Sequence, residues 1–331
     1  MQVGFAQRII TPFTTMPMAG YDKRHIPFKG IHDDLYAKCL LLENCGEHLA
    51  IFSLDLLGID EKLTDEIIKA LVECGEKIAD DRMLVCATHN HSGPSGIFTG
   101  RADFNKEYYD FLVKSCKEAF LSAKRDSRAA FLQLACTEIG DLASVRNEVP
   151  EPAGYKIKAC IVKAVRDDGC VMLVNFPCHP TVLDENNLFI SKDLLYGLEL
   201  GLKDTGMERH IFINGAAGDI STRHFKTAAT FAEAERLGRI IAGNVLEAGL
   251  PFKLIHNPVF FAEKRREPKG VFMVIRGALS ARIELEKVRE DGEYIHYSTE
   301  FSVPSAGIAY FRFEISTDYG FLFVGRDREG K

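Results

Sequence analysis

Two histidines separated by one residue, His89 and His91, are the side chains of this sequence best suited to chemistry. They follow an apolar run, Met83–Ala87, which predicts a buried strand, and they begin a loop rich in Gly and Pro. If strand geometry continues to the histidines, both side chains enter one pocket at the carboxyl end of the strand. Neutral imidazole is the commonest protein metal ligand and also a general base near pH 7. The pattern allows two interpretations, a metal or catalytic site and a pair of surface-loop histidines.

Two later segments of the chain end in the same way. His179 follows the apolar run 171–174, and a polar segment with Asp219 and Ser221 follows the apolar run 211–213. Because open α/β sheets carry their ligands beyond the carboxyl ends of strands, we expect these loops to share one rim. We therefore predict that His179 joins the two earlier histidines in one pocket, bordered by the segment that contains Asp219.

The polar segments resemble the signatures of the neutral/alkaline non-lysosomal ceramidases. The matching segments are 88–94 (Thr-His-Asn-His-Ser-Gly-Pro), 175–181 (Asn-Phe-Pro-Cys-His-Pro-Thr), 218–221 (Gly-Asp-Ile-Ser), 10–12 (Ile-Thr-Pro) and 18–21 (Met-Ala-Gly-Tyr). They occur in the family's order and cover roughly the first 225 residues, so the resemblance does not depend on one short motif. It implies a zinc-dependent hydrolase of amide bonds.

The resemblance also assigns roles to individual residues. His89 and His179 match histidines that bind Zn²⁺ in the family, where the metal lowers the pKa of a water molecule and polarises the substrate carbonyl. His91 would relay the proton, and Arg146 would orient the substrate or stabilise the developing oxyanion. Ser221 matches an active-site serine that would hydrogen-bond the substrate amide, with an N-cap role as the alternative.

The family's remaining zinc ligands are a glutamate in a Pro-Gly-Glu motif and a downstream tyrosine. Here the apolar run 319–324 is followed by Gly-Arg-Asp-Arg-Glu at 325–329. Codons for Pro-Gly-Glu-Ile-Gly-Lys that are read two bases late can encode this segment, so we expect a frameshift or truncation, which genomic sequencing past codon 324 would test. Zinc binding would then be weak or absent, because catalytic zinc normally has three protein ligands.

A third ligand could come from elsewhere in the chain or from a neighbouring subunit. The candidates are His91, Asp55, Asp219 and His224. Asp55 lies near the end of the predicted strand 48–57, where a buried, hydrogen-bonded structural role explains it equally well.

Two functional hypotheses follow. The first is a zinc-dependent, ceramidase-like amidohydrolase that acts on a small-molecule or lipid amide. The second is a catalytically impaired or non-enzymatic homologue that acts as a binding or oligomeric module, with a homo-oligomer as one allowed state. Metal analysis of protein purified without chelator would separate the two.

Composition narrows the remaining classes. The 331 residues are 46% hydrophobic and 27% charged, as in an ordinary globular protein. A net charge of −6 argues against nucleic acid as a partner. We find no signal-peptide pattern and no apolar run long enough for a transmembrane segment. Nine cysteines without Cys-x-x-Cys spacing favour free thiols and a cytoplasmic location.

The elements that must position these residues alternate between strands and helices. Strands are predicted at 35–43, 48–57, 83–87, 130–137, 155–165, 170–176, 211–213, 271–275, 294–303, 308–315 and 321–324. Helices are predicted over 63–78 with Asp60 as N-cap, and over 106–123, 194–202 and 227–248. We therefore expect an α/β fold with a layered mixed β-sheet and flanking helices. Residues 1–331 would form a single catalytic domain in which 258–331 is a β-rich terminal part without the family's last metal ligands.

Overall fold

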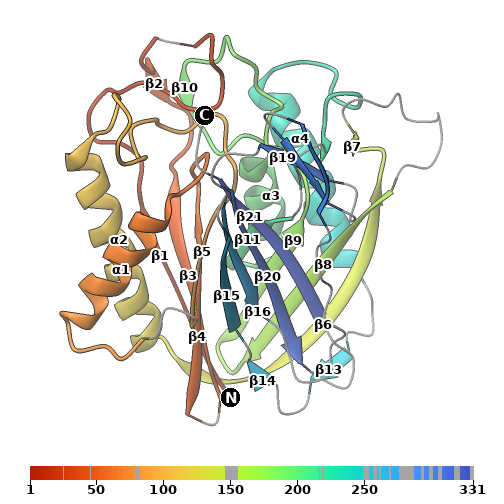
Figure 1. Ribbon diagram of the computed structural model, residues 1–331. Helices are drawn as coiled ribbons and strands as arrows, with labels where there is room; N and C mark the ends of the chain where they lie inside the picture. The colour runs from red at the N-terminus through yellow and green to blue at the C-terminus, as the bar shows by residue number, and fades with distance from the viewer. Residues whose placement is uncertain are drawn as a thin grey trace.

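In the computed structural model, two half-sheets form the middle of the molecule and a pair of helices covers each outer side (Figure 1). The structure describes residues 1–248 apart from 25, 45, 79–81, 146–155, 216, 218 and 219, and beyond 248 it describes only the backbone of strands. The predicted fold class, a layered mixed α/β sheet with flanking helices and a β-rich carboxyl-terminal segment, is confirmed.

The first half-sheet carries the strand that leads to the His-x-His motif. Its strands, in sheet order, are β1 (Gln2–Ile9), β3 (Tyr36–Asn44), β4 (Glu47–Leu54) and β5 (Met83–Ala87). The first three pair antiparallel, whereas β4 and β5 pair parallel across α1 (Glu61–Val72). Side chains alternate along β3: Cys39 and Leu41 pack toward the outer helices, and Leu40 and Leu42 pack toward the other half-sheet. Both faces of this half-sheet are therefore buried.

The second half-sheet carries the strand that leads to His179. Its strands are β6 (Arg128–Gly140), β8 (Lys156–Arg166), β9 (Gly169–Phe176) and β11 (Arg209–Asn214), and β13 (Lys253–Ile255) pairs with β6. The strands predicted at 155–165 and 170–176 correspond to β8 and β9, which pair antiparallel, and β11 pairs parallel to β9. The two half-sheets are joined through β1 and β6, where Gln2 lies opposite Ala129 and Val3 opposite Arg128. The site histidines thus come from two separate parts of the sheet.

Two pairs of helices close the outer faces. Helices α1 and α2 (Lys106–Arg125) pack on the first half-sheet, and α3 (Leu194–Lys203) and α4 (Phe231–Glu247) pack on the second. Asp60 accepts the N–H of Leu63 at 2.9 Å, which confirms the predicted N-cap. Helix α4 begins later than the predicted 227 because Thr230 is its N-cap. None of the described helices combines the length and apolar character needed to cross a membrane.

Helices α3 and α4 approach each other closely through glycines. A Cβ at Gly238 would lie 2.0 Å from Leu194 O and 2.4 Å from Leu198 N, whereas a Cβ at Gly243 on the same helix would meet nothing within 4 Å. We expect Gly238→Ala to lower the free energy of unfolding by about 1–3 kcal/mol through overpacking. Gly243→Ala should raise it by up to about 1 kcal/mol through helix propensity. Urea unfolding of both variants tests this, and equal effects would contradict the close helix packing.

The remaining strands are short or lie beyond residue 248. The short ones are β2 (Gly30–Ile31), β7 (Ser144–Val145), β10 (Phe189–Ile190) and β12 (Ile220–Ser221). The later ones are β14 (Val259–Phe260), β15 (Ala262–Glu267), β16 (Gly270–Ile275), β17 (Lys287–Asp291), β18 (Tyr294–Tyr297), β19 (Phe301–Pro304), β20 (Ile308–Ser316) and β21 (Phe321–Arg328).

Two predictions for the later strands need correction. The predicted strand 294–303 is wrong, since β18 and β19 pair antiparallel with each other. No Gly or Pro marks the reversal, so the apolar pattern alone reads as one strand. The strand predicted at 321–324 is too short, since β21 continues to Arg328 and pairs with β20 along its whole length. Strand β17 lies in the charged stretch 284–292, where the sequence predicts no strand.

Candidate metal centre

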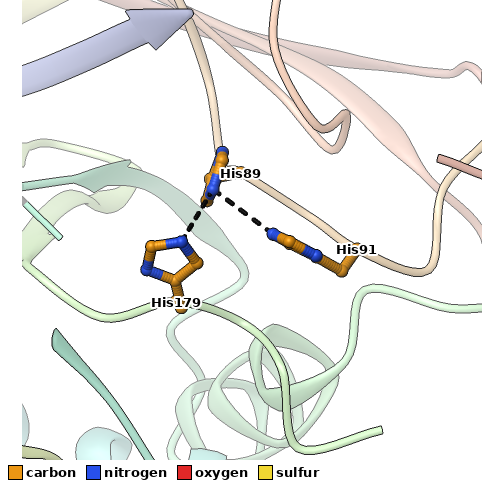
Figure 2. A group of neighbouring side chains, drawn as sticks. All are labelled: His89, His91 and His179. Atoms are coloured by element: carbon orange, nitrogen blue, oxygen red, sulfur yellow. Dashed lines mark hydrogen bonds between the residues drawn. The ribbon is translucent and has the colours of Figure 1, made fainter. Parts of the chain in front are cut away.

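The imidazoles of His89, His91 and His179 converge, as the sequence predicted (Figure 2). The Nε2 atoms of His89 and His179 are 2.9 Å apart, and the Nε2 atoms of His91 and His89 are 3.3 Å apart. The possible ligand atoms of the three residues all lie within 4.8 Å of one another. The cluster could therefore hold a metal ion.

His89 lies in a turn rather than in an extension of the strand. β5 ends at Ala87, and His89 has a φ of +66°, in the left-handed region that few residues other than Gly adopt. The expected reason for the convergence of the His-x-His pair, strand alternation, is therefore wrong. The N–H of Asn90 donates to Leu56 O at 2.9 Å and holds the turn. Such a backbone costs about 1–3 kcal/mol and persists where the surroundings fix it, typically at functional sites.

His179 is fixed by the short strand β12. Its N–H donates to Ile220 O at 2.9 Å, and an isolated bridge pairs its backbone with Ser221. Its Nδ1 lies 2.5 Å from Ala217 O and 3.2 Å from Ile220 O. The side chain is buried, with 5% of its surface exposed. Both the backbone and the ring of His179 thus depend on the segment that follows β11.

Backbone carbonyls also fix the tautomers of two histidines. His89 Nδ1 lies 2.8 Å from Leu57 O, and His179 Nδ1 lies next to Ala217 O. A carbonyl oxygen can only accept, so both Nδ1 atoms carry the proton and both Nε2 atoms present lone pairs. Two lone pairs facing each other repel unless a proton or a cation lies between them. This donor set fits a metal ion, since histidine ligands typically have the other ring N–H held in this way.

The amino-terminal segment braces His91. The Tyr21 ring packs edge-on against His91 with centroids 5.2 Å apart, and its hydroxyl donates to Leu183 O at 2.6 Å. Arg24 Nη2 donates to His91 O at 2.6 Å. Gly20 has a φ of +100°, and a Cβ there would lie 2.6 Å from His91 Nδ1. In the sequence, the Met-Ala-Gly-Tyr segment is recognisable only as a family signature, and its contacts with His91 appear only in the structure.

The other predicted site residues lie in different surroundings. Asp55 is outside the histidine cluster, and its Oδ2 accepts the N–H of Tyr36 at 2.9 Å. Burial raises the pKa of Asp55 to about 6, although Lys192 and Lys38 oppose the shift. A buried structural role for Asp55 is therefore better supported than a role as a metal ligand. His224 is exposed and does not belong to the cluster.

Ser221 lies beside His179, and its Oγ accepts the N–H of Arg223 at 3.4 Å. Cys178 is buried in the core between β9 and the outer helices. Arg146 and Asp219 lie outside the described residues, so their predicted places at the site stay predictions.

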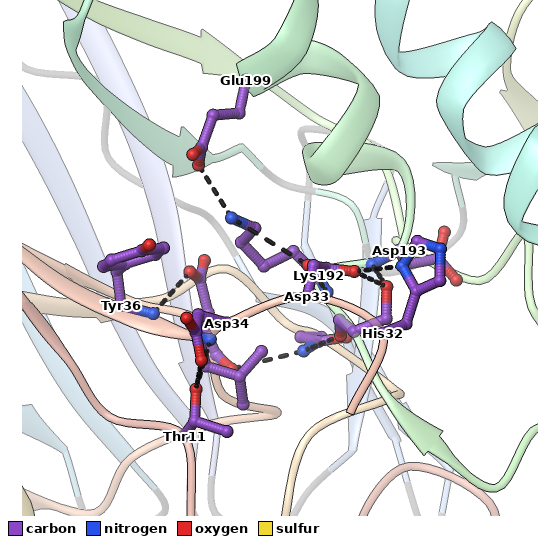
Figure 3. A network of polar contacts seen from close by, with 12 residues as sticks. Thr11, His32, Asp33, Asp34, Tyr36, Lys192, Asp193 and Glu199 are labelled. Atoms are coloured by element: carbon purple, nitrogen blue, oxygen red, sulfur yellow. Dashed lines mark hydrogen bonds and ion pairs between the residues drawn. The ribbon is translucent and has the colours of Figure 1, made fainter. Parts of the chain in front are cut away.

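Figure 3 shows a buried polar network that includes Asp33, Lys192 and Glu199. A hydrogen bond between Asn90 and Ser191 connects this network to the histidine loop. Asn90, between the two histidines of the motif, donates through Nδ2 to Ser191 O at 2.8 Å, and the Ser191 hydroxyl donates to Asp33 at 2.5 Å. Lys192 donates to Glu199 Oε2 at 2.8 Å. This network ties the histidine loop to helix α3.

Lys38 extends the network across the two half-sheets. Its Nζ lies 3.5 Å from Glu199 Oε2 and donates to His210 Nε2 at 2.9 Å. Burial lowers the pKa of His210 to about 4, so this ring is neutral and accepts from the lysine. These residues were not predicted as a network: Lys38 and Glu199 are single charged side chains within apolar segments, and His210 directly follows the charged pair Glu208 and Arg209.

Comparisons with known proteins identify a family and a similar fold. Residues 1–208 match the family model described as neutral/alkaline non-lysosomal ceramidase, N-terminal. The fold is similar to a neutral ceramidase from Pseudomonas aeruginosa, with 19% identity, a TM-score of 0.68, and coverage of 79% of this chain and 47% of that one. A ceramidase in complex with C2 gives the same identity and TM-score, with 46% of that chain covered. This chain thus spans less than half of either structure. The match over most of its length shows that the chain belongs to the neutral/alkaline non-lysosomal ceramidase family, through that family's N-terminal domain.

Proposed function

We propose that this protein is a zinc-dependent amidohydrolase whose substrate is a lipid amide of the ceramide class or a smaller acyl amide. The observation that carries the proposal is the convergence of His89, His91 and His179, with two tautomers fixed by backbone carbonyls. Family membership supports amide hydrolysis, and the ceramidase structures with the same fold support the lipid substrate. We also propose a cytoplasmic location, because nine cysteines without Cys-x-x-Cys spacing favour free thiols.

Zinc suits an all-imidazole donor set. With Zn–N bonds of about 2.0–2.1 Å, tetrahedral coordination places two ligand nitrogens about 3.3 Å apart. The His91–His89 separation of 3.3 Å agrees with this value, and the 2.9 Å between His89 and His179 is slightly shorter. A zinc ion held there would lower the pKa of a water molecule and polarise the substrate carbonyl. We therefore propose all three histidines as ligands.

The remaining roles belong to groups around the cluster. As an alternative to ligation, His91 would take the proton from the attacking water and pass it to the leaving amine. We propose that Arg146 orients the substrate or stabilises the negative charge that develops on its carbonyl oxygen. The hydroxyl of Ser221, next to the His179 backbone, would hydrogen-bond the substrate amide.

Metal content and turnover together test the proposal. Protein purified without chelator should contain zinc and hydrolyse a short-chain N-acylsphingosine or a simple N-acyl amide, and chelator should abolish the activity. Zinc without turnover of either substrate, or neither zinc nor turnover, would contradict it. The second hypothesis, a binding or oligomeric module, would then be favoured and examined by light scattering.

Substitutions at two residues separate ligands from other pocket groups. We expect His91→Ala to lower zinc affinity if His91 is a ligand, and to lower only turnover if it relays a proton. Ser221→Ala should leave zinc bound and lower turnover, since Ser221 contributes no atom to the cluster. Equilibrium zinc titration and steady-state kinetics give both values. Zinc loss in Ser221→Ala would show that the hydroxyl acts through the position of His179 instead.

A further inference from the structure

The three histidines belong to two half-sheets, so the spacing of their ring nitrogens depends on how the halves are held together. His89 and His91 follow β5 in the first half, and His179 follows β9 in the second. The strand pairing that joins the halves, between β1 and β6, involves Gln2 and Val3 at the beginning of β1. The loops that carry the histidines therefore need connections beyond this strand pairing, and the bond from Asn90 to Ser191 is one of them.

Asn214 provides such a connection at the carboxyl end of β11. Its Nδ2 donates to Thr88 O at 2.9 Å and to Cys178 O at 3.0 Å, and its Oδ1 accepts the N–H of Cys178 at 3.1 Å. Thr88 directly precedes His89, and Cys178 directly precedes His179. One planar amide thus bonds to the backbone next to a histidine from each half-sheet.

The chemistry of the amide explains why asparagine stands at this position. The side chain is 3% exposed, so water does not replace a lost partner. An amide offers two N–H donors and one acceptor oxygen, and all three are used by the contacts to Thr88 and Cys178. Aspartate keeps the acceptor but loses both donors, and alanine loses all three contacts.

We propose that Asn214 is a positioning residue that sets the distance between the Nε2 atoms of His89 and His179. Its side-chain hydrogen bonds go to the backbone of Thr88 and Cys178, so it acts by holding the peptide groups that precede the two histidines. The inference rests on the proposed function, because it concerns the same metal centre.

Asn175 provides a matched control on the neighbouring strand β9. It is also a buried asparagine, 7% exposed, whose Nδ2 donates to Ile213 O at 2.9 Å. That bond lies within the second half-sheet and reaches neither Thr88 nor Cys178. Asn175→Ala therefore removes the same buried amide without releasing the connection between the two loops.

The test compares Asn214→Ala with Asn175→Ala in the full chain. Zinc affinity is measured by competition with a chromophoric chelator, and the visible spectrum of the Co²⁺-loaded protein reports coordination geometry. We expect Asn214→Ala to lower zinc affinity by about 10–100-fold, the usual effect of losing support around a metal site, and to alter the Co²⁺ spectrum. Asn175→Ala should leave both unchanged. If the alanine variant does not fold, Asn214→Asp replaces it in the test, because aspartate keeps the bond from Cys178 N–H.

Wild-type affinity and an unchanged Co²⁺ spectrum in both Asn214 variants would overturn the inference. An equal loss in Asn175→Ala would also overturn it, because the effect would then be general destabilisation. If the wild-type protein binds no metal, the proposed function fails. Backbone amide hydrogen exchange then tests whether Asn214 connects the two histidine loops. Exchange at Cys178 that accelerates in Asn214→Ala but not in Asn175→Ala would support the connection, and equal exchange would refute it.

Discussion

Replacing His179 with alanine is expected to abolish stable zinc binding and, with it, amide hydrolysis. His179 supplies the nitrogen that lies 2.9 Å from His89 Nε2, and it is the member of the cluster that comes from the second half-sheet. Without it, the ligands that remain in the cluster come from a single loop. Loss of support around a ligand already costs about 10–100-fold in affinity, so loss of the ligand itself should cost more.

The matched control for this variant is His224→Ala. His224 lies on the segment after Ser221, is exposed and does not belong to the cluster, so its removal should leave zinc affinity and turnover unchanged. Zinc titration measures both variants, and circular dichroism shows whether each is folded. A folded His179→Ala protein with wild-type zinc affinity would place the metal elsewhere and would remove the basis of the proposed mechanism.

The layered fold was largely predictable because its strands and helices carry complete periodic patterns. Helix α2, with apolar residues at helical spacing, and strand β5, buried along its whole length, are examples. Strand β1 was not predicted from the sequence. Its sequence mixes buried apolar residues such as Val3 and Phe5 with Gly4 and polar residues, and its pairing with β3 decides its structure.

The histidines of the site could also be predicted, because each lies near the end of an apolar run. Their exact arrangement could not be predicted from the sequence. The left-handed backbone of His89 and the contact of His91 with Gly20 and Tyr21 depend on segments far apart in the sequence. The hydrogen bonds of Asn214 could not be predicted either, since an asparagine at the end of a strand can have many structural roles.

Glu199 is the centre of the buried network, and its replacement should produce the largest loss of stability. Its carboxylate, 9% exposed, lies 2.8 Å from Lys192 Nζ and 3.5 Å from Lys38 Nζ. The two lysines are 4% and 9% exposed. Removing one partner of a buried ion pair leaves an uncompensated charge, which typically costs about 3–5 kcal/mol. We expect Glu199→Gln to lower the free energy of unfolding by about this amount.

The control for this prediction is Glu235→Gln on α4. Glu235 pairs with Arg239 at 2.8 Å, but both side chains are more than a third exposed, at 37% and 38%. Exposed pairs contribute at most about 1 kcal/mol, so this variant should be close to wild type. Urea unfolding at pH 7 measures both variants, and equal small effects would show that Glu199 does not compensate the buried lysines.

The pH dependence of Glu199→Gln identifies the cause of its instability. Burial already lowers the pKa of Lys38, and the Glu199 carboxylate opposes that shift, so the variant should have a still lower Lys38 pKa. Between that pKa and the unfolded value of about 10.4, the unfolded chain binds more protons, and stability therefore rises with pH. We expect the difference between variant and wild type to narrow from pH 7 toward pH 10. A difference that is constant over this range would mean that lost packing, and not an unpaired lysine charge, destabilises the variant.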